Sequence, residues 1–296
     1  MKVVLFEDES ASDFLPLVFL RPVFELLCGA LTLRQKVQEL FADSELHLEV
    51  RPELAEVAAD AFGTGALNHP ERLAPDDDML IVNAAAVLTG APEGYRQEER
   101  ACAAEDGAFV WAFLTAETVA DMEADSAQEL AGLALDQFGS GACEDLLMRR
   151  PWDLVEHNPD QIERDWAAAY ADRPGTDPGP DVAVLGSRDA VFIAEDACVE
   201  PCAVLDCRRG PIIIEAGAAV RAHSTVEGPA FVGPGVQVRG AHVVAGCSLG
   251  ERSELSGHFE QSILQGHCAQ TGPGYVGHSY LGEWVQIGPS AAGETP

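Results

Sequence analysis

The sequence has few basic residues and almost no lysine. Its 296 residues include 18 Lys and Arg against 49 Asp and Glu, a formal net charge of −31, and the lysines are Lys2 and Lys36 alone. A chain with this charge repels nucleic acid and anionic membranes, so we expect neither as a partner. The acids are spread along the whole length, which indicates a surface adapted to high salt, where screening weakens self-repulsion.

Long apolar runs and paired cysteine motifs are missing as well. No stretch reaches the ~18 apolar residues of a transmembrane helix. The apolar start at residues 3–6 meets Glu7 and Asp8 too soon for the apolar core of a signal peptide, so we expect a cytoplasmic protein with reduced thiols. The eight cysteines include no Cys-x-x-Cys pair, and the sequence therefore predicts no zinc site built on one.

An aliphatic residue returns every six positions in the second half of the sequence. The clearest series is Ile214, Val220, Val226, Val232 and Val238, and a small or apolar residue follows four places after each of the first four. This period fits neither a helix nor a single amphipathic strand. It is typical of a coil of flat faces, each of which turns one aliphatic residue inward, and it predicts a parallel β-helix.

The first half of the sequence alternates strand-like and helix-like segments. This alternation predicts an α/β domain around a mostly parallel sheet. The expected strands are 2–6, 79–83 and 109–114, and the expected helices are 31–42, 115–123, 126–138 and 150–170. The run RPGTDPGP at 173–180 cannot hold a helix, so we expect a linker there, between domains at 1–172 and 181–296.

Three blocks resemble a known family. They are residues 6–36 (FEDESASDFLPLVFLRPVFELLCGALTLRQK), 150–155 (RPWDLV) and 274–287 (GYVGHSYLGEWVQI). Together they are similar to sugar nucleotidyltransferases with a C-terminal hexapeptide-repeat domain. The match is to the short, divergent bacterial form of the bifunctional N-acetylglucosamine-1-phosphate uridyltransferase and glucosamine-1-phosphate acetyltransferase.

The resemblance implies a fold and an activity for each half. The N-terminal α/β domain would join a nucleoside triphosphate to a sugar 1-phosphate with release of pyrophosphate, using Mg2+, to make a nucleotide sugar of the UDP-N-acetylglucosamine type. The C-terminal half would be a left-handed parallel β-helix that assembles as a homotrimer. Fold alone does not establish function, so the activity depends on the site residues.

Arg21 and Lys36 are the candidate catalytic residues. Nucleotidyl transfer spreads negative charge over phosphate oxygens, and cations are scarce in this chain. Arg21 follows the first strand and Lys36 lies in the next helix, so both can face the carboxyl end of that strand, where α/β sheets bind ligands. The alternative for Lys36 is an ordinary exposed helix lysine. The divergent family form tends to carry an arginine where this chain has Leu27, which removes one cation from the expected site.

The resemblance also implies nucleotide or sugar contacts at Asn83, Gly29 and Thr32. Asn83 ends the expected strand at 79–83, where turn chemistry is an equally good explanation, and Thr32 also suits a helix cap. Asp8 is the candidate metal ligand. The acidic run at 76–78 is a second possibility, although such a run is usually a solvated loop.

The acetyltransferase half lacks its expected base. Acyl transfer to an amine needs a general base, a histidine in this family, and Gly272 stands at the aligned position. The sequence also stops at Pro296, before the further coils that help to bind coenzyme A in the family. We therefore expect acetyl transfer to be weak or absent, and coenzyme A binding with it.

Two other functional classes stay open. One is a nucleotide-sugar-binding or oligomeric scaffold protein that has lost its chemistry. The other is a metal-dependent lyase on the β-helix, because five histidines lie within the coils, although solvated or turn histidines explain them as well. These histidines are His223, His242, His258, His267 and His278.

Overall fold

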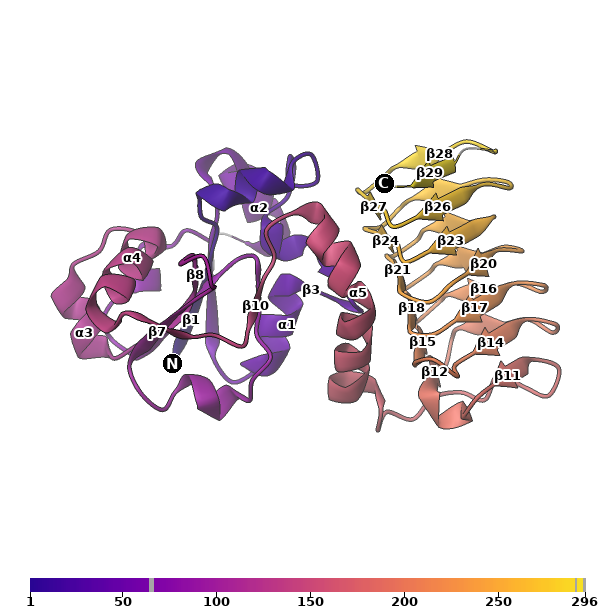
Figure 1. Ribbon diagram of the computed structural model, residues 1–296, viewed down its shortest axis with the longest axis horizontal. Coiled ribbons are helices and arrows are strands. Elements are labelled where there is room, and N and C mark those ends of the chain that lie inside the picture. The colour runs from indigo at the N-terminus through magenta and orange to yellow at the C-terminus, as the bar shows by residue number, and fades with distance from the viewer. Residues whose placement is uncertain (64–66, 291, 295–296) are drawn as a thin grey trace. The chain divides into compact units, whose positions relative to one another are not determined.

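The chain divides into two compact units. The computed structural model describes residues 1–63, 67–290 and 292–294 (Figure 1). Contacts within the chain define unit 1 as Met1–Leu26 with Thr32–Pro151, and unit 2 as Leu27–Leu31 with Trp152–Pro296.

Unit 2 therefore includes residues that precede the expected linker at 173–180. Helix α5 (Pro151–Asp165) and the π-helical turn after it, Trp166–Tyr170, belong to unit 2 apart from Pro151. These segments confirm the expected helix at 150–170, with a change of helix type at its end. The domain boundaries expected from the sequence stay a prediction.

Unit 1 is built on a six-stranded mixed sheet in the order β4-β1-β5-β8-β7-β9. β1 runs parallel to β4 and β5, β8 runs antiparallel to both of its neighbours, and β9 runs parallel to β7. The strands are β1 (Lys2–Phe6), β4 (Glu45–Glu49), β5 (Met79–Asn83), β7 (Arg100–Ala103), β8 (Phe109–Leu114) and β9 (Ser140–Ala142). The three expected strands are confirmed with their bounds, since each is an apolar run buried on both faces.

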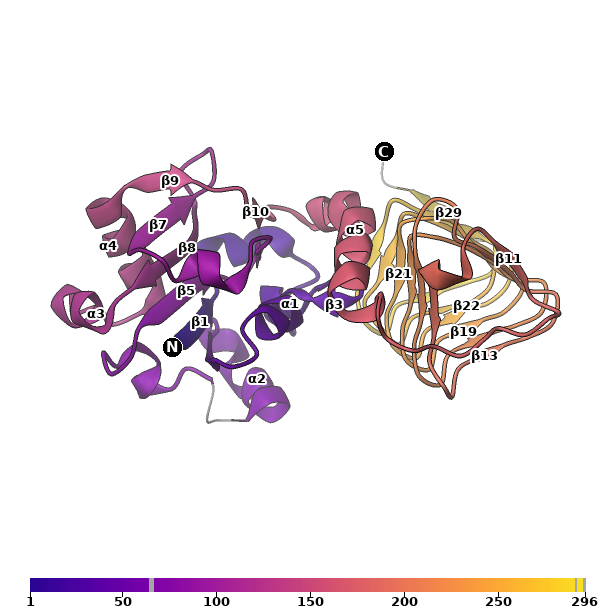
Figure 2. The same cartoon turned by 90° about the horizontal axis from the view of Figure 1, so that it is seen from below.

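Helices cover the sheet of unit 1. They are α1 (Leu33–Leu40), α2 (Ala55–Phe62), α3 (Ala116–Met122) and α4 (Ala127–Phe138). Thr32 caps α1 as expected, and α4 packs its buried side on β7 and β8 (Figure 2). The expected helices at 31–42, 115–123 and 126–138 are thus confirmed with slightly shorter bounds.

Short elements complete the chain. Two two-stranded pairs join β2 (Leu27–Cys28) with β3 (Leu31–Thr32), and β6 (Ala86–Val87) with β10 (Leu146–Leu147). The 3-10 turns are η1 (Glu9–Phe14), η2 (Val23–Glu25), η3 (Pro52–Leu54), η4 (Pro70–Leu73), η5 (Pro92–Tyr95) and η7 (Arg188–Ala190).

Most of unit 2 is a parallel β-helix whose three sheets form the sides of a prism, seen end-on in Figure 2. The first sheet holds β11 (Ala183–Leu185), β14 (Val204–Asp206), β17 (Thr225–Glu227), β20 (His242–Val243), β23 (His258–Glu260), β26 (Tyr275–Gly277) and β29 (Ala292–Glu294). The second holds β12 (Val191–Ile193), β15 (Ile212–Ile214), β18 (Ala230–Val232), β21 (Cys247–Leu249), β24 (Ile263–Leu264) and β27 (Tyr280–Leu281). The third holds β13 (Cys198–Val199), β16 (Ala219–Val220), β19 (Gln237–Val238), β22 (Glu254–Leu255), β25 (Ala269–Gln270) and β28 (Gln286–Ile287).

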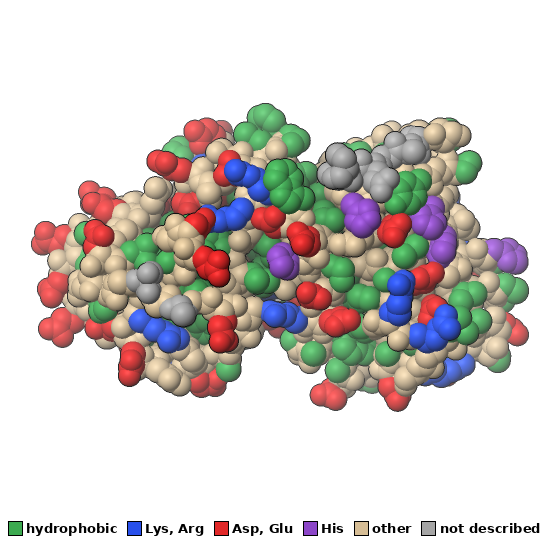
Figure 3. All heavy atoms as spheres, viewed as in Figure 1, with side chains coloured by type: hydrophobic (Ala, Val, Ile, Leu, Met, Phe, Trp, Pro, Cys, Tyr) green, Lys and Arg blue, Asp and Glu red, His purple; other side chains and the backbone are tan. Residues whose placement is uncertain are grey.

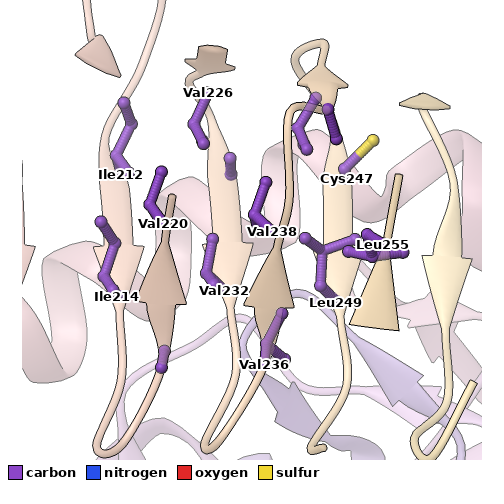
Figure 4. Packing of buried hydrophobic residues seen from close by; sticks show 14 of the residues in the cluster. Ile212, Ile214, Val220, Val226, Val232, Val236, Val238, Cys247, Leu249 and Leu255 are labelled. Carbon is purple, nitrogen blue, oxygen red and sulfur yellow. The ribbon is translucent and has the colours of Figure 1, made fainter. Parts of the chain in front are cut away.

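The six-residue pattern forms the interior of this coil. Val220, Val238 and Leu255 are neighbours in the register of the third sheet, are at most 1% exposed, and point into the coil (Figure 4). Burial of each such side chain contributes roughly 1.5–3 kcal/mol. The expected β-helix is confirmed, while its left hand and its assembly as a trimer stay predictions.

The described residues contain no helix that is both long and apolar enough to cross a membrane. Acidic side chains are spread over the face shown in Figure 3 instead of gathering in one patch.

Candidate active site at the ends of two parallel strands

Strands β1, β4 and β5 end at one edge of the sheet. Phe6 at the end of β1 pairs with Glu49 on one side and with Asn83 on the other. Because the three strands are parallel, the segments that follow them leave from the same edge, where α/β sheets bind ligands.

The structure brings Asp8 and Asn83 together. The Asn83 side-chain amide donates a hydrogen bond of 2.7 Å to Oδ2 of Asp8, and its own Oδ1 accepts from the backbone N–H of Ala85 at 2.9 Å. Asn83 is 1% exposed. Asp8 also caps η1 through Oδ1, which accepts from the N–H of Ser10 at 2.9 Å. Two segments far apart in the sequence are thus joined at the sheet edge.

Asp8 offers an oxygen ligand of the kind that magnesium prefers. The described residues include no group of three or more His, Cys, Asp and Glu side chains placed to hold an ion. Magnesium does not need such a cage, because it keeps several waters and binds through one or two carboxylates and the phosphates of a substrate. The Asp8 carboxylate fits that requirement, whereas the Asn83 amide faces it with an NH2 group, which binds no cation.

The acidic run at 76–78 binds amino and amide groups of unit 1 instead. Asp76 pairs with the ammonium of Lys2, and Asp77 pairs with the N-terminal amine at 2.6 Å. The hydrogen bond from Lys2 is the main cause that lowers the pKa of Asp76. Asp78 accepts from the N–H of Ala116 at 3.2 Å.

Glu7 is a feature of this edge that the sequence did not single out. Its side chain is fully buried, and its carboxylate accepts from the N–H of Val23 at 2.9 Å and from the N–H of Arg51 at 3.2 Å. The Arg51 guanidinium lies 3.3 Å from the same carboxylate. Burial raises the pKa of Glu7, against these two backbone hydrogen bonds and the charge of Arg51.

Arg21 lines a hollow of about 210 Å³ in unit 1. Apolar side chains of η3 and α2 form most of the wall, among them Leu54 and Phe62. Glu25 lies in the same wall, and burial raises its pKa against the hydrogen bond and charge of Arg34 and the charge of Arg21. The hollow thus combines an apolar wall with a guanidinium group.

Lys36 lies on α1, and Thr32 caps that helix. Thr32 forms a capping box with Gln35: its hydroxyl accepts from the Gln35 N–H at 3.3 Å, and its own N–H donates to Gln35 Oε1 at 2.9 Å. This capping role accounts for Thr32 without a ligand. Lys36 is the fourth residue of the helix and is half-buried. Contacts of either residue with a nucleotide or a sugar stay predictions.

Gly29 belongs to unit 2 and is fixed there. Its N–H donates to Asn158 Oδ1 and its carbonyl accepts from the Ser248 hydroxyl, both at 2.7 Å. Its φ is +84°, and a Cβ would collide with Asp165. Packing within unit 2 therefore requires glycine here, and the expected nucleotide contact stays a prediction.

The coil histidines contact other rings and acids. His242 pairs with Glu227 at 2.7 Å, and the His258 ring lies 4.9 Å from that of His242 and 5.4 Å from that of Tyr275. Among the described residues of the coil, no three His, Cys, Asp or Glu side chains are placed to hold one metal ion.

Comparison with known proteins identifies a family for the part of the chain that holds the candidate site. No curated protein matches the sequence. A family model described as sugar nucleotidyl transferase matches residues 3–174, a range that contains Asp8, Arg21, Lys36 and Asn83. Because this match covers more than half of the sequence, the chain belongs to the sugar nucleotidyl transferase family.

Proposed function

We propose that the protein joins a nucleoside triphosphate to a sugar 1-phosphate and releases pyrophosphate. An oxygen of the sugar phosphate attacks the α-phosphorus of the nucleotide, the bond from that phosphorus to the bridging oxygen breaks, and pyrophosphate leaves. The observation that carries the proposal is the contact between Asp8 and Asn83 at the shared ends of β1 and β5, inside the region that matches the family.

The four candidate residues have separate roles in this proposal. Asp8 would hold a magnesium ion, which would neutralise phosphate charge, and Asn83 fixes the orientation of the Asp8 carboxylate. Arg21 binds phosphate oxygens from the rim of its hollow, where a guanidinium can donate two parallel hydrogen bonds. Lys36 supplies a second positive charge to the leaving pyrophosphate.

The finer specificity follows from the resemblance. We propose UTP and N-acetylglucosamine 1-phosphate as the substrates, a homotrimer as the assembly, and little or no acetyl transfer by the coil. The coil then serves as a platform for assembly. Incubation with acetyl-coenzyme A and glucosamine 1-phosphate tests the expected lack of acetyl transfer, since release of the coenzyme A thiol would contradict it.

The decisive experiment measures pyrophosphate release at low and at molar salt. UTP, dTTP, ATP, CTP and GTP are each combined with glucose 1-phosphate, glucosamine 1-phosphate or N-acetylglucosamine 1-phosphate, with magnesium or with EDTA. We expect release with at least one pair, and none with EDTA. No release with any pair rejects the proposal. Thermal stabilisation by a nucleotide sugar without turnover would instead support a binding protein.

Variants test the two cations. Arg21→Ala and Lys36→Met should each lower kcat/KM by about 100- to 1000-fold, as expected for loss of one preorganised charged donor. Arg96→Ala is the matched control, because Arg96 is exposed and donates to Ser44 at 3.2 Å. Its kcat/KM should stay at the wild-type value. Equal losses in all three variants would argue against specific phosphate contacts.

A further inference from the structure

The segment that carries Arg21 is exposed at its tip and buried at both ends. Phe19 and Leu20 are 68% and 74% exposed, and Arg21 follows them directly. Val18 before this tip and Val23 after it are each 1% exposed. Two exposed apolar residues and the half-buried Arg21 therefore lie between two buried anchors.

One ion pair, formed by the buried Glu7 and the partly exposed Arg51, holds both anchors. The carbonyl of Val18 accepts a hydrogen bond of 2.8 Å from Nη2 of Arg51, and the N–H of Val23 donates one of 2.9 Å to Oε1 of Glu7. Glu7 and Arg51 are themselves joined through Oε2, which lies 3.3 Å from Nε of Arg51 and accepts from its backbone N–H. Consecutive polar contacts thus link Val18 to Val23 through the ion pair. These contacts join the two ends of the exposed tip.

We propose that Glu7 and Arg51 form a clamp that positions Arg21 for its phosphate contact. The inference rests on the proposed function. The clamp residues are positioning residues, since they hold the backbone on both sides of Arg21 and act on the substrate through it. A rigid base lets the guanidinium meet the phosphate without first being ordered, and this preorganisation raises the rate.

The chemistry of the clamp needs these two residue types. A carboxylate offers two acceptor oxygens, and here both face N–H donors. A glutamine would turn an NH2 group toward one of those donors and so lose that bond. A guanidinium donates from Nε and Nη2 in fixed directions, whereas a lysine has a single ammonium and cannot reproduce that geometry.

The first test combines kinetics with hydrogen–deuterium exchange of the full-length protein. In Glu7→Gln we expect faster exchange in peptides that cover residues 15–22 and a fall of at least about tenfold in kcat/KM for the nucleotide. Arg51→Lys is the milder change and should shift exchange and kcat/KM in the same direction. It replaces Glu7→Gln as the test if that variant folds poorly. Wild-type exchange at 15–22 in a folded variant would overturn the clamp, as would faster exchange with unchanged kinetics.

Glu99→Gln is the matched control. Glu99 is half-buried and accepts from the backbone N–H of Thr115 at 2.7 Å, so it too is a carboxylate that holds a backbone segment of unit 1. This variant should leave both the exchange at 15–22 and kcat/KM unchanged. A loss of activity as large as that of Glu7→Gln would reduce the clamp to a general stability effect.

A double-mutant cycle tests whether the clamp acts through Arg21. In the Arg21→Ala background, Glu7→Gln should cause little further loss of kcat/KM, because the group that it positions is gone. Full additivity of the two losses would overturn the positioning role. If the wild type releases no pyrophosphate, the proposed function fails separately. Exchange then decides the clamp, which faster exchange confined to 15–22 supports and unchanged exchange rejects.

Discussion

The two units place their polar side chains differently. In unit 1, Glu7 and Asn83 are buried at the ends of strands and bind the loops that leave the sheet. In the coil of unit 2 the interior is mainly apolar with a few buried serines, and arginines on its outer surface pair with acids of neighbouring coils, as Arg221 does with Glu200. Buried carboxylate and amide groups in unit 1 therefore fix loops at strand ends. The buried serines of the coil instead bind backbone within the repeat, as Ser224 does when it accepts from the Gly240 N–H at 3.0 Å.

Two buried amide side chains in unit 2 depart from this rule in opposite ways. Asn158 is fully buried and fully used: it accepts from Gly29 at 2.7 Å and donates to the carbonyl of Gly246 at 2.9 Å. Gln270 is 2% exposed, but neither polar atom of its side chain has a hydrogen-bond partner. The contrast predicts stability changes of opposite sign when each amide is replaced by an apolar side chain.

The larger change is expected for Asn158→Leu. It removes the partners of the Gly29 N–H and the Gly246 carbonyl, and each orphaned buried group costs roughly 1–3 kcal/mol, so the free energy of unfolding should fall by about 2–5 kcal/mol. Denaturant unfolding measures this fall. Ser248→Ala removes the hydroxyl that bonds the Gly29 carbonyl and lies 3.1 Å from Asn158 Oδ1, and it should cost about half as much because it orphans one backbone group instead of two. A loss no greater than that of Ser248→Ala would show that Asn158 is not the main anchor of this segment.

The second change, Gln270→Met, should stabilise the coil. Gln270 stands in the inward column between Leu255 and Ile287, and methionine has a similar length without the two unsatisfied polar atoms. Removal of an unpaired buried amide should raise the free energy of unfolding by about 1–2 kcal/mol. Thermal and denaturant unfolding provide the measurement. Destabilisation would mean that the amide has a role in the coil, and Gln265→Met, at a position whose side chain accepts from the Leu27 N–H, gives the contrasting case.

The elements with local signals could be predicted from the sequence. Strands β5 and β8 follow from apolar runs whose side chains are all buried, and the coil follows from a period that repeats over many turns. The antiparallel direction of β8 has no such signal, since a strand buried on both faces reads alike in either direction.

The candidate site was predictable to the same extent. Asp8 stands out because it comes just after a buried strand and Asn83 because it ends one, and the structure joins them. Glu7 does not stand out, since it is one acid among 49, and only its burial and its long-range bonds to Val23 and Arg51 distinguish it. The place of Gly29 depends on Ser248, 219 residues away, and no local pattern contains such a contact.

The smallest effect is expected on the outside of the coil. Arg221 donates to Glu200 Oε1 at 2.7 Å and to Gln237 Oε1 at 3.1 Å, but the Arg221 and Glu200 side chains are 44% and 31% exposed. Exposed pairs gain little from their attraction and are screened by salt. Arg221→Ala should therefore lower Tm slightly at low salt and leave it unchanged at molar salt.

The salt dependence of the change in Tm distinguishes charge attraction from hydrogen bonding on this face. The Glu200 carboxylate keeps its hydrogen bond of 2.9 Å from the Ala222 N–H after the arginine is gone, and that bond is the main cause that lowers the Glu200 pKa. Arg221→Gln, which retains a donor without the charge, serves as the control. If Arg221→Ala lowers Tm equally at low and molar salt while Arg221→Gln does not, hydrogen bonding between coils, and not charge, stabilises the outer face. In that case polar contacts would matter to both units, and the division between a polar sheet edge and an apolar coil would lose its basis.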